Sequence, residues 1–158
     1  KLIGALCNSQ TTVTKELWTM DILSPVLGMM VLTLAMTIVI FASRLPIIVK
    51  NFPNLQGGKY ADDMKQNMSA GMRNITDNYN HLFEQPVLFY ATAVYIHLVG
   101  HVDLIHVRCA WFFVGFRVAH SLVQATVNNV ATRLTMFIGA SITLAVMVVR
   151  EMIVALAG

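Results

Sequence analysis

Charged and amide side chains recur at helical spacing in two segments of an otherwise apolar chain. One set stands at positions i, i+3 and i+7 and comprises Arg117, His120 and Gln124. A second set has the same period and comprises Asp77, Asn80 or His81, and Glu84. Residues spaced in this way share one face of a helix. Two such faces in contact would form a pocket lined by groups of both signs, in which pairing of Glu84 with Arg117 would reduce the cost of burying each charge.

The composition places these residues in a lipid environment. The chain has 158 residues, of which 56% are hydrophobic and 12% are charged, whereas a soluble domain has about 25% charged residues. A charge at the centre of a bilayer costs at least about 2.5–3.5 kcal/mol on insertion scales, so ionisable residues within membrane spans are candidates for function. The formal net charge of +3 comes from basic residues that mostly flank apolar runs. We interpret them as topology signals and expect no nucleic acid partner.

Four segments have the length of membrane-spanning helices, which need about 20 mostly apolar residues. We expect spans at about residues 22–43, 78–100, 104–126 and 132–156 of a membrane domain that covers residues 20–158. The polar segment 44–77 is expected to be a loop, because Pro46, Pro53 and Gly57-Gly58 disfavour a helix in its first half. Helical character is expected to return in AGMRNITDNYNHLFE, residues 70–84, which leads into the second span. Pro86 is expected to kink the second span, because it cannot donate a hydrogen bond to the carbonyl of Leu82. The sequence therefore predicts an all-α integral membrane protein, a four-helix transmembrane bundle.

The first residues of the chain differ from this membrane domain. Met20 begins the segment MDILSPVLGMM, which is typical of an ordinary protein start. We interpret residues 1–19 as an N-terminal extension that is non-native or lies upstream of the true start. A cleaved signal peptide is a less favoured interpretation of the first span, because the apolar run is long and no small-x-small cleavage site follows it.

Lysine and arginine residues are distributed unequally between the two sides of the expected bundle. The 44–77 loop and the 125–133 turn carry six of them. The opposite side has Lys1, Lys15, Arg108 and Arg150. By the positive-inside rule the loop faces the cytoplasm. We therefore expect both termini on the periplasmic or lumenal side, and a bacterial inner membrane as the location.

This topology places polar groups of three spans at a similar depth near the cytoplasmic side. They include Asn78, Asn80, Glu84, Arg117, His120, Gln124 and Arg133. A binding pocket is the favoured interpretation of this convergence. Two structural interpretations stay open, because polar side chains often join helices within membranes. An arginine at a span end, such as Arg133, also often extends to the lipid headgroups.

Other candidate residues give weaker signals. His97 and His101 have no evident partner and are expected near the opposite interface. Cys7 and Cys109 are interpreted as free thiols. The ten methionines are interpreted as span residues, because no Met/His ligand spacing repeats. The sequence therefore predicts no metal site.

Two motifs resemble those of the MAPEG family, the membrane-associated proteins in eicosanoid and glutathione metabolism. The segment FVGFRVAHSLVQATVNNVATR, residues 113–133, is similar to the Arg-x-x-His signature of the third helix and to the arginine that begins the fourth. The segment NYNHLFEQPVLFY, residues 78–90, resembles the Asn-x-x-Glu motif of the second helix followed by proline. The four-span layout also agrees, so the resemblance covers about residues 20–157.

The resemblance implies a homotrimer that binds glutathione between subunits near the cytoplasmic side. The implied glutathione contacts are Arg73, Asn80 or Asn78, Glu84, Arg117 and His120, with Gln124 at the position of a family tyrosine. Arg133 would be the catalytic residue that stabilises the glutathione thiolate, because a nearby cation lowers the pKa of a thiol. Asn80 and Glu84 are four residues apart rather than the family's three, which resembles a less characterised bacterial branch.

The leading functional prediction is a glutathione-dependent membrane transferase or peroxidase that acts on lipophilic electrophiles from the bilayer. Glutathione would be a co-substrate, and the partners would be membrane lipids and further copies of the chain. The alternative is a non-catalytic membrane protein with the same fold, either an accessory subunit of a larger membrane complex or a lipid-binding scaffold. A transporter is less favoured, because the sequence contains no internal inverted repeat.

Overall fold

The computed structural model describes residues 21–51 and 68–157, which form five helical segments. They are α2 (Leu23–Asn51), α4 (Ala70–His81), α5 (Gln85–Leu98), α6 (Leu104–Ala125) and α7 (Val130–Ala157). The described ranges contain no strand, which confirms the prediction of an all-α chain. The expected N-terminal extension with Cys7, and residues 52–67 of the expected loop, lie outside the described residues.

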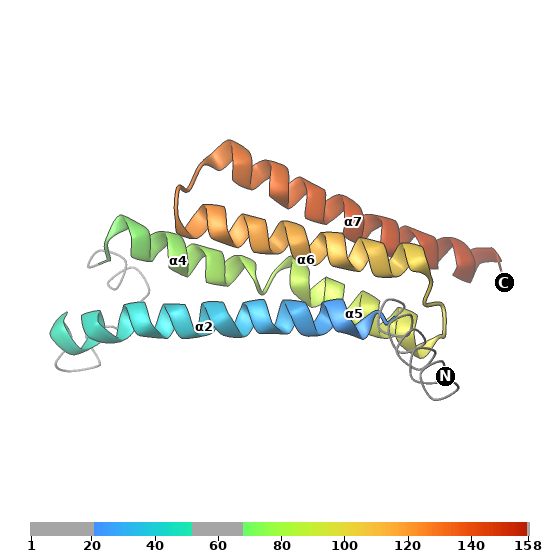
Figure 1. Ribbon diagram of the computed structural model, residues 1–158, viewed down its shortest axis with the longest axis horizontal. Helices are drawn as coiled ribbons and strands as arrows, with labels where there is room; N and C mark the ends of the chain where they lie inside the picture. Colours follow the sequence, from blue (N-terminus) through green and yellow to red (C-terminus); the bar gives the residue numbers. More distant parts are fainter. Residues whose placement is uncertain (1–20, 52–67, 158) are drawn as a thin grey trace, which may run out of the picture.

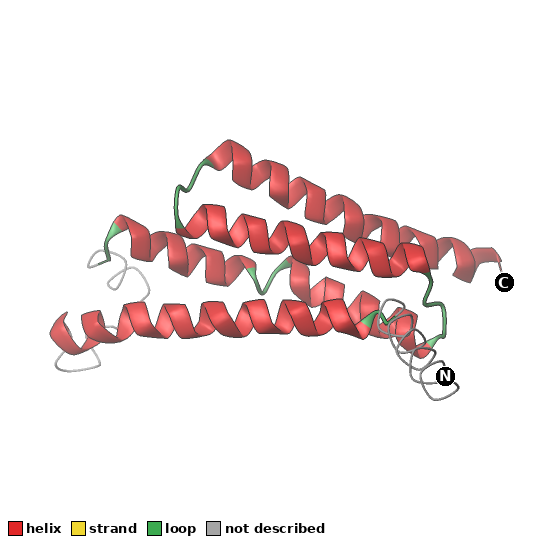
Figure 2. Cartoon of the chain, in the orientation of Figure 1, coloured by secondary structure: helices red, strands yellow, loops and turns green. Residues whose placement is uncertain are grey.

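The helices run alongside one another in an elongated bundle (Figure 1). In this view α4 and α5 lie end to end between α2 and α6. Figure 2 shows that short loops join the helices from α4 onward, so that α5, α6 and α7 alternate in direction. The bundle therefore has two distinct ends. The α6–α7 end contains the turn between those helices and the start of α4, and the α5–α6 end contains the last residues of α7.

Apolar side chains from all these helices form the core. The rings of Phe89 and Phe113 stack with centroids 4.5 Å apart and an interplanar angle of 11°. Met147 of α7 is fully buried and belongs to the same core. Gly139 allows α7 to approach α6 closely, because an added Cβ at this position would lie 2.8 Å from Cζ of Phe116.

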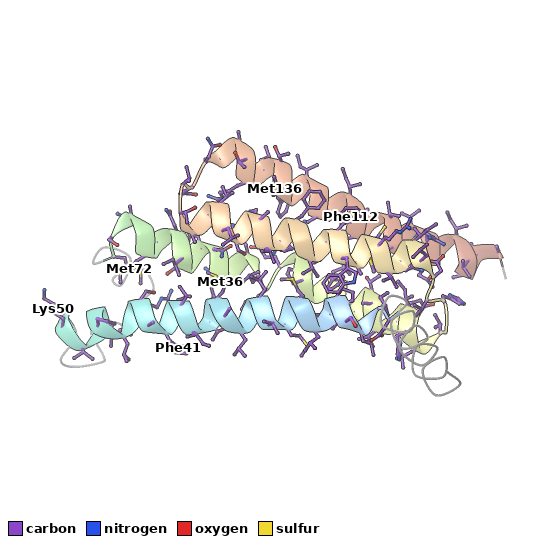
Figure 3. The ribbon with its side chains drawn as sticks, in the orientation of Figure 1. Met36, Phe41, Lys50, Met72, Phe112 and Met136 are labelled. Carbon is purple, nitrogen blue, oxygen red and sulfur yellow. The ribbon has the colours of Figure 1, made fainter. Side chains whose placement is uncertain are left out.

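Large apolar side chains also cover the outside of the bundle. Leu27, Leu34, Ile38 and Phe41 of α2 are 61–67% exposed. Figure 3 shows Phe41 directed away from the bundle, whereas Met36 lies on the side towards α4 and is 9% exposed. Soluble monomers rarely expose continuous apolar surface of this kind. Such a surface is typical of helices in contact with lipid.

Helix length supports the same conclusion. Among the described helices, α2 and α7 are long and apolar enough to cross a membrane. At 1.5 Å per residue each is about 40 Å long, which exceeds the hydrocarbon thickness of about 30 Å. By contrast, α4 has 12 residues and α5 has 14, so that neither is long enough alone.

The first helix extends further than its sequence predicts. α2 continues through Pro46 to Asn51, so the expectation that Pro46 would prevent a helix there was wrong. The proline ring fixes φ near −65°, which suits a helix, and removes one backbone hydrogen bond. Pro46 lies near the end of α2, and only residues 47–51 of the helix follow it. The missing hydrogen bond therefore affects the last part of α2 and leaves the longer part before it intact.

The second expected span is broken rather than kinked. α4 ends at His81 and α5 begins at Gln85. Pro86 lies in the first turn of α5, where a backbone N–H has no helical partner to lose. The N–H of Leu82 instead bonds to the carbonyls of Asn78 and Tyr79, which closes the end of α4. The proline is therefore placed at a helix start, and the helix before it ends.

Candidate functional site

The polar residues of α6 face the interior of the bundle. Arg117, His120 and Gln124 are 1, 4 and 1% exposed, as their spacing along one helix face predicts. Asn78 of α4 is fully buried, and α4 packs against α6. Within the described residues the side-chain amide of Asn78 has no hydrogen-bond partner. Both α4 and α6 therefore contribute buried polar side chains.

Arg117 bonds to the end of α4. Its Nη2 donates a hydrogen bond to the backbone oxygen of His81, the last residue of that helix. The final carbonyls of a helix have no partner within the helix, so this bond satisfies one of them. The Nε and Nη1 donors of Arg117 are buried and have no partner among the described residues.

Glu84 is placed differently from its expected position. Its side chain is 56% exposed and pairs with His81, with 3.0 Å between Oε2 and the ring Nδ1. The described ranges contain no ion pair between Glu84 and Arg117, so the expected pairing was wrong. The reason is the end of α4 at His81, because Glu84 no longer continues the helical stripe that its spacing suggested.

A pocket of about 200 Å³ lies where α4, α6 and α7 meet at the α6–α7 end. It is lined by His81, His120, Val130, Arg133, Leu134 and Phe137. The two histidine rings are 6.2 Å apart and nearly perpendicular. The polar lining therefore consists of two imidazoles and a guanidinium, and such a site suits an anionic group. Its apolar lining comes from α7.

The guanidinium of Arg133 is held by the turn between α6 and α7. Its Nη1 donates to Oδ1 of Asn128 at 2.6 Å. Nδ2 of Asn128 donates in turn to Oδ1 of Asn74 on α4 at 2.8 Å. Asn128 has φ of +50°, a left-handed conformation that asparagine adopts more readily than most residues. Three segments thus fix the position of Arg133.

The other predicted site residues lie outside this pocket. Arg73 and Asn80 are exposed on α4, and Arg73 lines a separate pocket of about 130 Å³. Gln124 is buried in the bundle. The structure therefore brings His120 and Arg133 together, connects Arg117 to them through His81, and does not bring Arg73 or Asn80 to the same place.

Several contributing residues were not predicted as site residues. His81 was considered as an alternative to Asn80 on the polar stripe but was not among the predicted binding residues. Asn128 lies in the expected 125–133 turn and close to Arg133 in the sequence, but no binding or positioning role was predicted for it. Asn74 gave no signal, because its contact joins residues 54 positions apart. Within the described residues no group of histidine, cysteine, aspartate and glutamate is arranged to hold a metal ion.

Comparison with known protein families identifies the chain. The model of the MAPEG family matches residues 22–153, which is most of the chain and includes every residue that lines the pocket. The chain belongs to the MAPEG family. This MAPEG chain is therefore an α-helical membrane protein, in agreement with its long apolar helices. Neither the curated proteins nor the solved structures gave a match.

Proposed function

We propose that this MAPEG chain is a glutathione-dependent transferase or peroxidase that acts on lipophilic electrophiles from the bilayer. The observation that carries the proposal is the pocket that Arg133 and His120 line together. Family membership supports glutathione as the thiol. The apolar side chains of Val130, Leu134 and Phe137 in the same pocket suit a lipophilic second substrate.

Arg133 is the proposed catalytic residue. A cation beside a thiol lowers its pKa and increases the fraction of thiolate, which is the nucleophile. In the transfer reaction the thiolate sulfur forms a bond to the electrophilic carbon, and the leaving group departs with the electron pair. The hydrogen bond from Arg133 to Asn128 uses one donor, so its other N–H groups are available to the sulfur.

The remaining residues are proposed to act in binding or positioning. Arg73, Asn80 and Glu84 are exposed on or just after α4, so a ligand shared with a neighbouring subunit could contact them in the proposed homotrimer. Asn78 and Gln124 are buried between helices and support the wall of the pocket. We assign Arg117 a positioning role, because its contact is with the backbone of His81.

The proposed topology has four crossings of a bacterial inner membrane. α2, α6 and α7 each make one crossing, and α4 and α5 together make the other. Lys50 and Arg73 lie near the α6–α7 end, which supports a cytoplasmic location for the candidate site and a periplasmic location for both termini.

Glutathione binding and turnover test the proposal. Purified protein in detergent should bind glutathione in calorimetry, and Arg133→Leu should lower thiol transfer by at least about 100-fold while the oligomer stays intact in size-exclusion chromatography. Arg108→Leu is the matched control, because Arg108 is an exposed arginine of α6 outside the pocket. Unchanged turnover in Arg133→Leu would show that the assigned mechanism is wrong.

The accessory or lipid-binding alternative predicts a different result. Well-folded protein would then bind no glutathione and would have no thiol-dependent activity. In the accessory case a stoichiometric protein partner would also be recovered after mild detergent extraction.

A further inference from the structure

Two further pockets lie along the surface where α5 packs against α7. The first has a volume of about 320 Å³ and is lined by Gln85, Leu88, Ser141, Leu144, Ala145 and Val148, among others. The second has a volume of about 330 Å³, and its lining includes Ala91, Tyr95, Val148, Glu151 and Met152. Because Val148 lines both, the two pockets form one continuous groove, which we call the α5–α7 groove.

The α5–α7 groove lies in line with the candidate site at Arg133. On α7 the lining residues of all three pockets recur at intervals of three or four, at Leu134, Phe137, Ser141, Leu144, Val148 and Glu151. On α5 the same intervals separate Gln85, Leu88, Thr92 and Tyr95. Residues at these intervals lie along one face of a helix. One strip of α7 therefore leads from the candidate site into the groove.

Gln85 and Ser141 stand between the candidate site and the apolar part of the groove. On α7, Ser141 is one turn after Phe137 of the candidate site and one turn before Leu144 of the groove. Nε2 of Gln85 donates to Oγ of Ser141 at 2.6 Å. Oε1 of Gln85 is buried and accepts no hydrogen bond from the described residues. A polar group of a ligand at this junction would therefore meet a buried acceptor.

The dimensions of the groove fit one hydrocarbon chain. The pocket next to the junction extends from Ser141 to Val149, which is about 12 Å along α7 at about 1.5 Å per residue. Its volume of about 320 Å³ divided by this length gives a cross-section of about 27 Å². A helix with its side chains has a diameter of about 10–12 Å, hence a cross-section on the order of 100 Å². The groove is therefore too narrow to enclose a further helix.

The far end of the groove is polar. Glu151 is 7% exposed, and its Oε2 lies 2.8 Å from Nδ1 of His101, so the expectation that His101 lacks a partner was wrong. Asp103, His106 and Arg150 complete this cluster of ionisable residues at the α5–α6 end. A buried carboxylate thus ends the apolar lining, so the part of the groove that suits hydrocarbon lies between Gln85 and Glu151.

We propose that the α5–α7 groove binds the hydrocarbon chain of the lipophilic second substrate, while the reactive carbon of that substrate lies in the pocket at Arg133. The inference rests on the proposed function and adds a substrate class, an electrophile that carries one unbranched alkyl chain. From Ser141 to Glu151 the groove is about 15 Å long, which an extended chain of about twelve carbon atoms fills at about 1.2 Å per bond. Leu88 and Val149 are 54 and 50% exposed, so the groove is open to the bilayer along its length and the chain enters from the side.

Thiol transfer to a short and a long electrophile tests the groove. The probes are the methyl and dodecyl esters of a chloronitrobenzoate, from which the glutathione thiolate displaces chloride. Ala145→Trp places a bulky side chain in the groove at an exposed position, so it should lower kcat/KM for the dodecyl ester by at least about 10-fold and keep that for the methyl ester within about twofold. Val146→Trp is the control, because Val146 is the next residue, is exposed and lines none of the three pockets. Equal effects of Ala145→Trp on the two esters would overturn the proposal.

Photolabelling tests chain binding without turnover. A dodecyl ester with a diazirine near the end of its chain should label α5 and α7 around Val148 in wild-type protein, and an excess of plain dodecyl ester or the change Ala145→Trp should suppress this labelling. Suppressible labelling without thiol transfer to either ester would contradict the proposed function and leave the chain site standing. Labelling that an excess of ester does not suppress, or that lies on other helices, would overturn the groove. So would a cross-link from Ala145→Cys to α2 of a second copy, because protein would then cover the groove.

Discussion

The guanidinium of Arg117 donates a hydrogen bond to the backbone oxygen of His81, where α4 ends. The bond joins the middle of α6 to the break in the second membrane segment. The side chain of His81 lines the same pocket as Arg133. Arg117 is buried and does not line the pocket itself. Its hydrogen bond helps to hold His81, which does line the pocket, in place.

Replacement of Arg117 should destabilise the bundle. Arg117→Ala removes a large buried side chain and leaves the His81 oxygen without its donor, so we expect a loss of about 3 kcal/mol in unfolding free energy. Arg108→Ala on the same helix is the control, and its exposed position predicts a change within about 0.5 kcal/mol. Unfolding in detergent measures both. Similar stabilities for the two variants would contradict a structural role for Arg117.

The contact between Asn128 and Arg133 should matter for activity more than for stability. Asn128→Gly keeps a backbone that accepts φ of +50° and removes the acceptor of Arg133, so kcat/KM for thiol transfer should fall by at least about 10-fold. Asn129→Ala provides the contrast. Its Oδ1 caps α7 by accepting from the N–H of Thr132, so its loss should cost about 1 kcal/mol of stability and leave kcat/KM nearly unchanged.

A side-chain hydrogen bond joins the start of α5 to α7. Nε2 of Gln85 donates to Oγ of Ser141 at 2.6 Å. Ser141→Ala should reduce stability by about 1 kcal/mol, which is typical of hydrogen bonds between membrane helices. Thr143→Val is a suitable comparison, because Oγ1 of Thr143 bonds only within its own helix among the described residues. A larger effect of Thr143→Val in thermal unfolding would show that the helix-to-helix bond is unimportant.

Asp103 should make the protein sensitive to acid. Partial burial acts to raise the pKa of Asp103, but hydrogen bonds from the backbone N–H of His106 and from Arg150 outweigh it and hold the pKa below its usual value. The stabilisation by the ionised carboxylate is therefore present above about pH 4 and is lost as the pH falls through the lowered pKa. Asp103→Asn keeps a good helix cap, so it should show a smaller loss of Tm between pH 5 and pH 3 than the wild type.

Helical periodicity predicted the parts of the site that lie on one helix. Arg117, His120 and Gln124 are buried on one face of α6 because side chains at i, i+3 and i+7 point in similar directions. The MAPEG motifs led to the correct family although neither lies within one helix, because residues 78–90 cross the break between α4 and α5 and residues 113–133 cross the α6–α7 turn.

Contacts between distant segments were not predictable in this way. The break after His81 depends on the new backbone hydrogen bonds of Leu82 and on Arg117 from another helix. The cluster at Glu151 depends on the packing of α7 against the α5–α6 turn, which places His101 and His106 next to a carboxylate about 50 residues away. Spacing along the chain contains no information on such neighbours.

The break between α4 and α5 also changes the electric field inside the bundle. The peptide dipoles of a helix sum to about half a positive charge at its first residues and half a negative charge at its last. An unbroken second helix would place both poles at the membrane surfaces. Two shorter helices instead place two poles in the interior, a positive one at the start of α5 and a negative one at His81, where Arg117 meets it. The backbone of α4 thus supplies a counter-charge for this buried arginine, to which no carboxylate within the described ranges is paired.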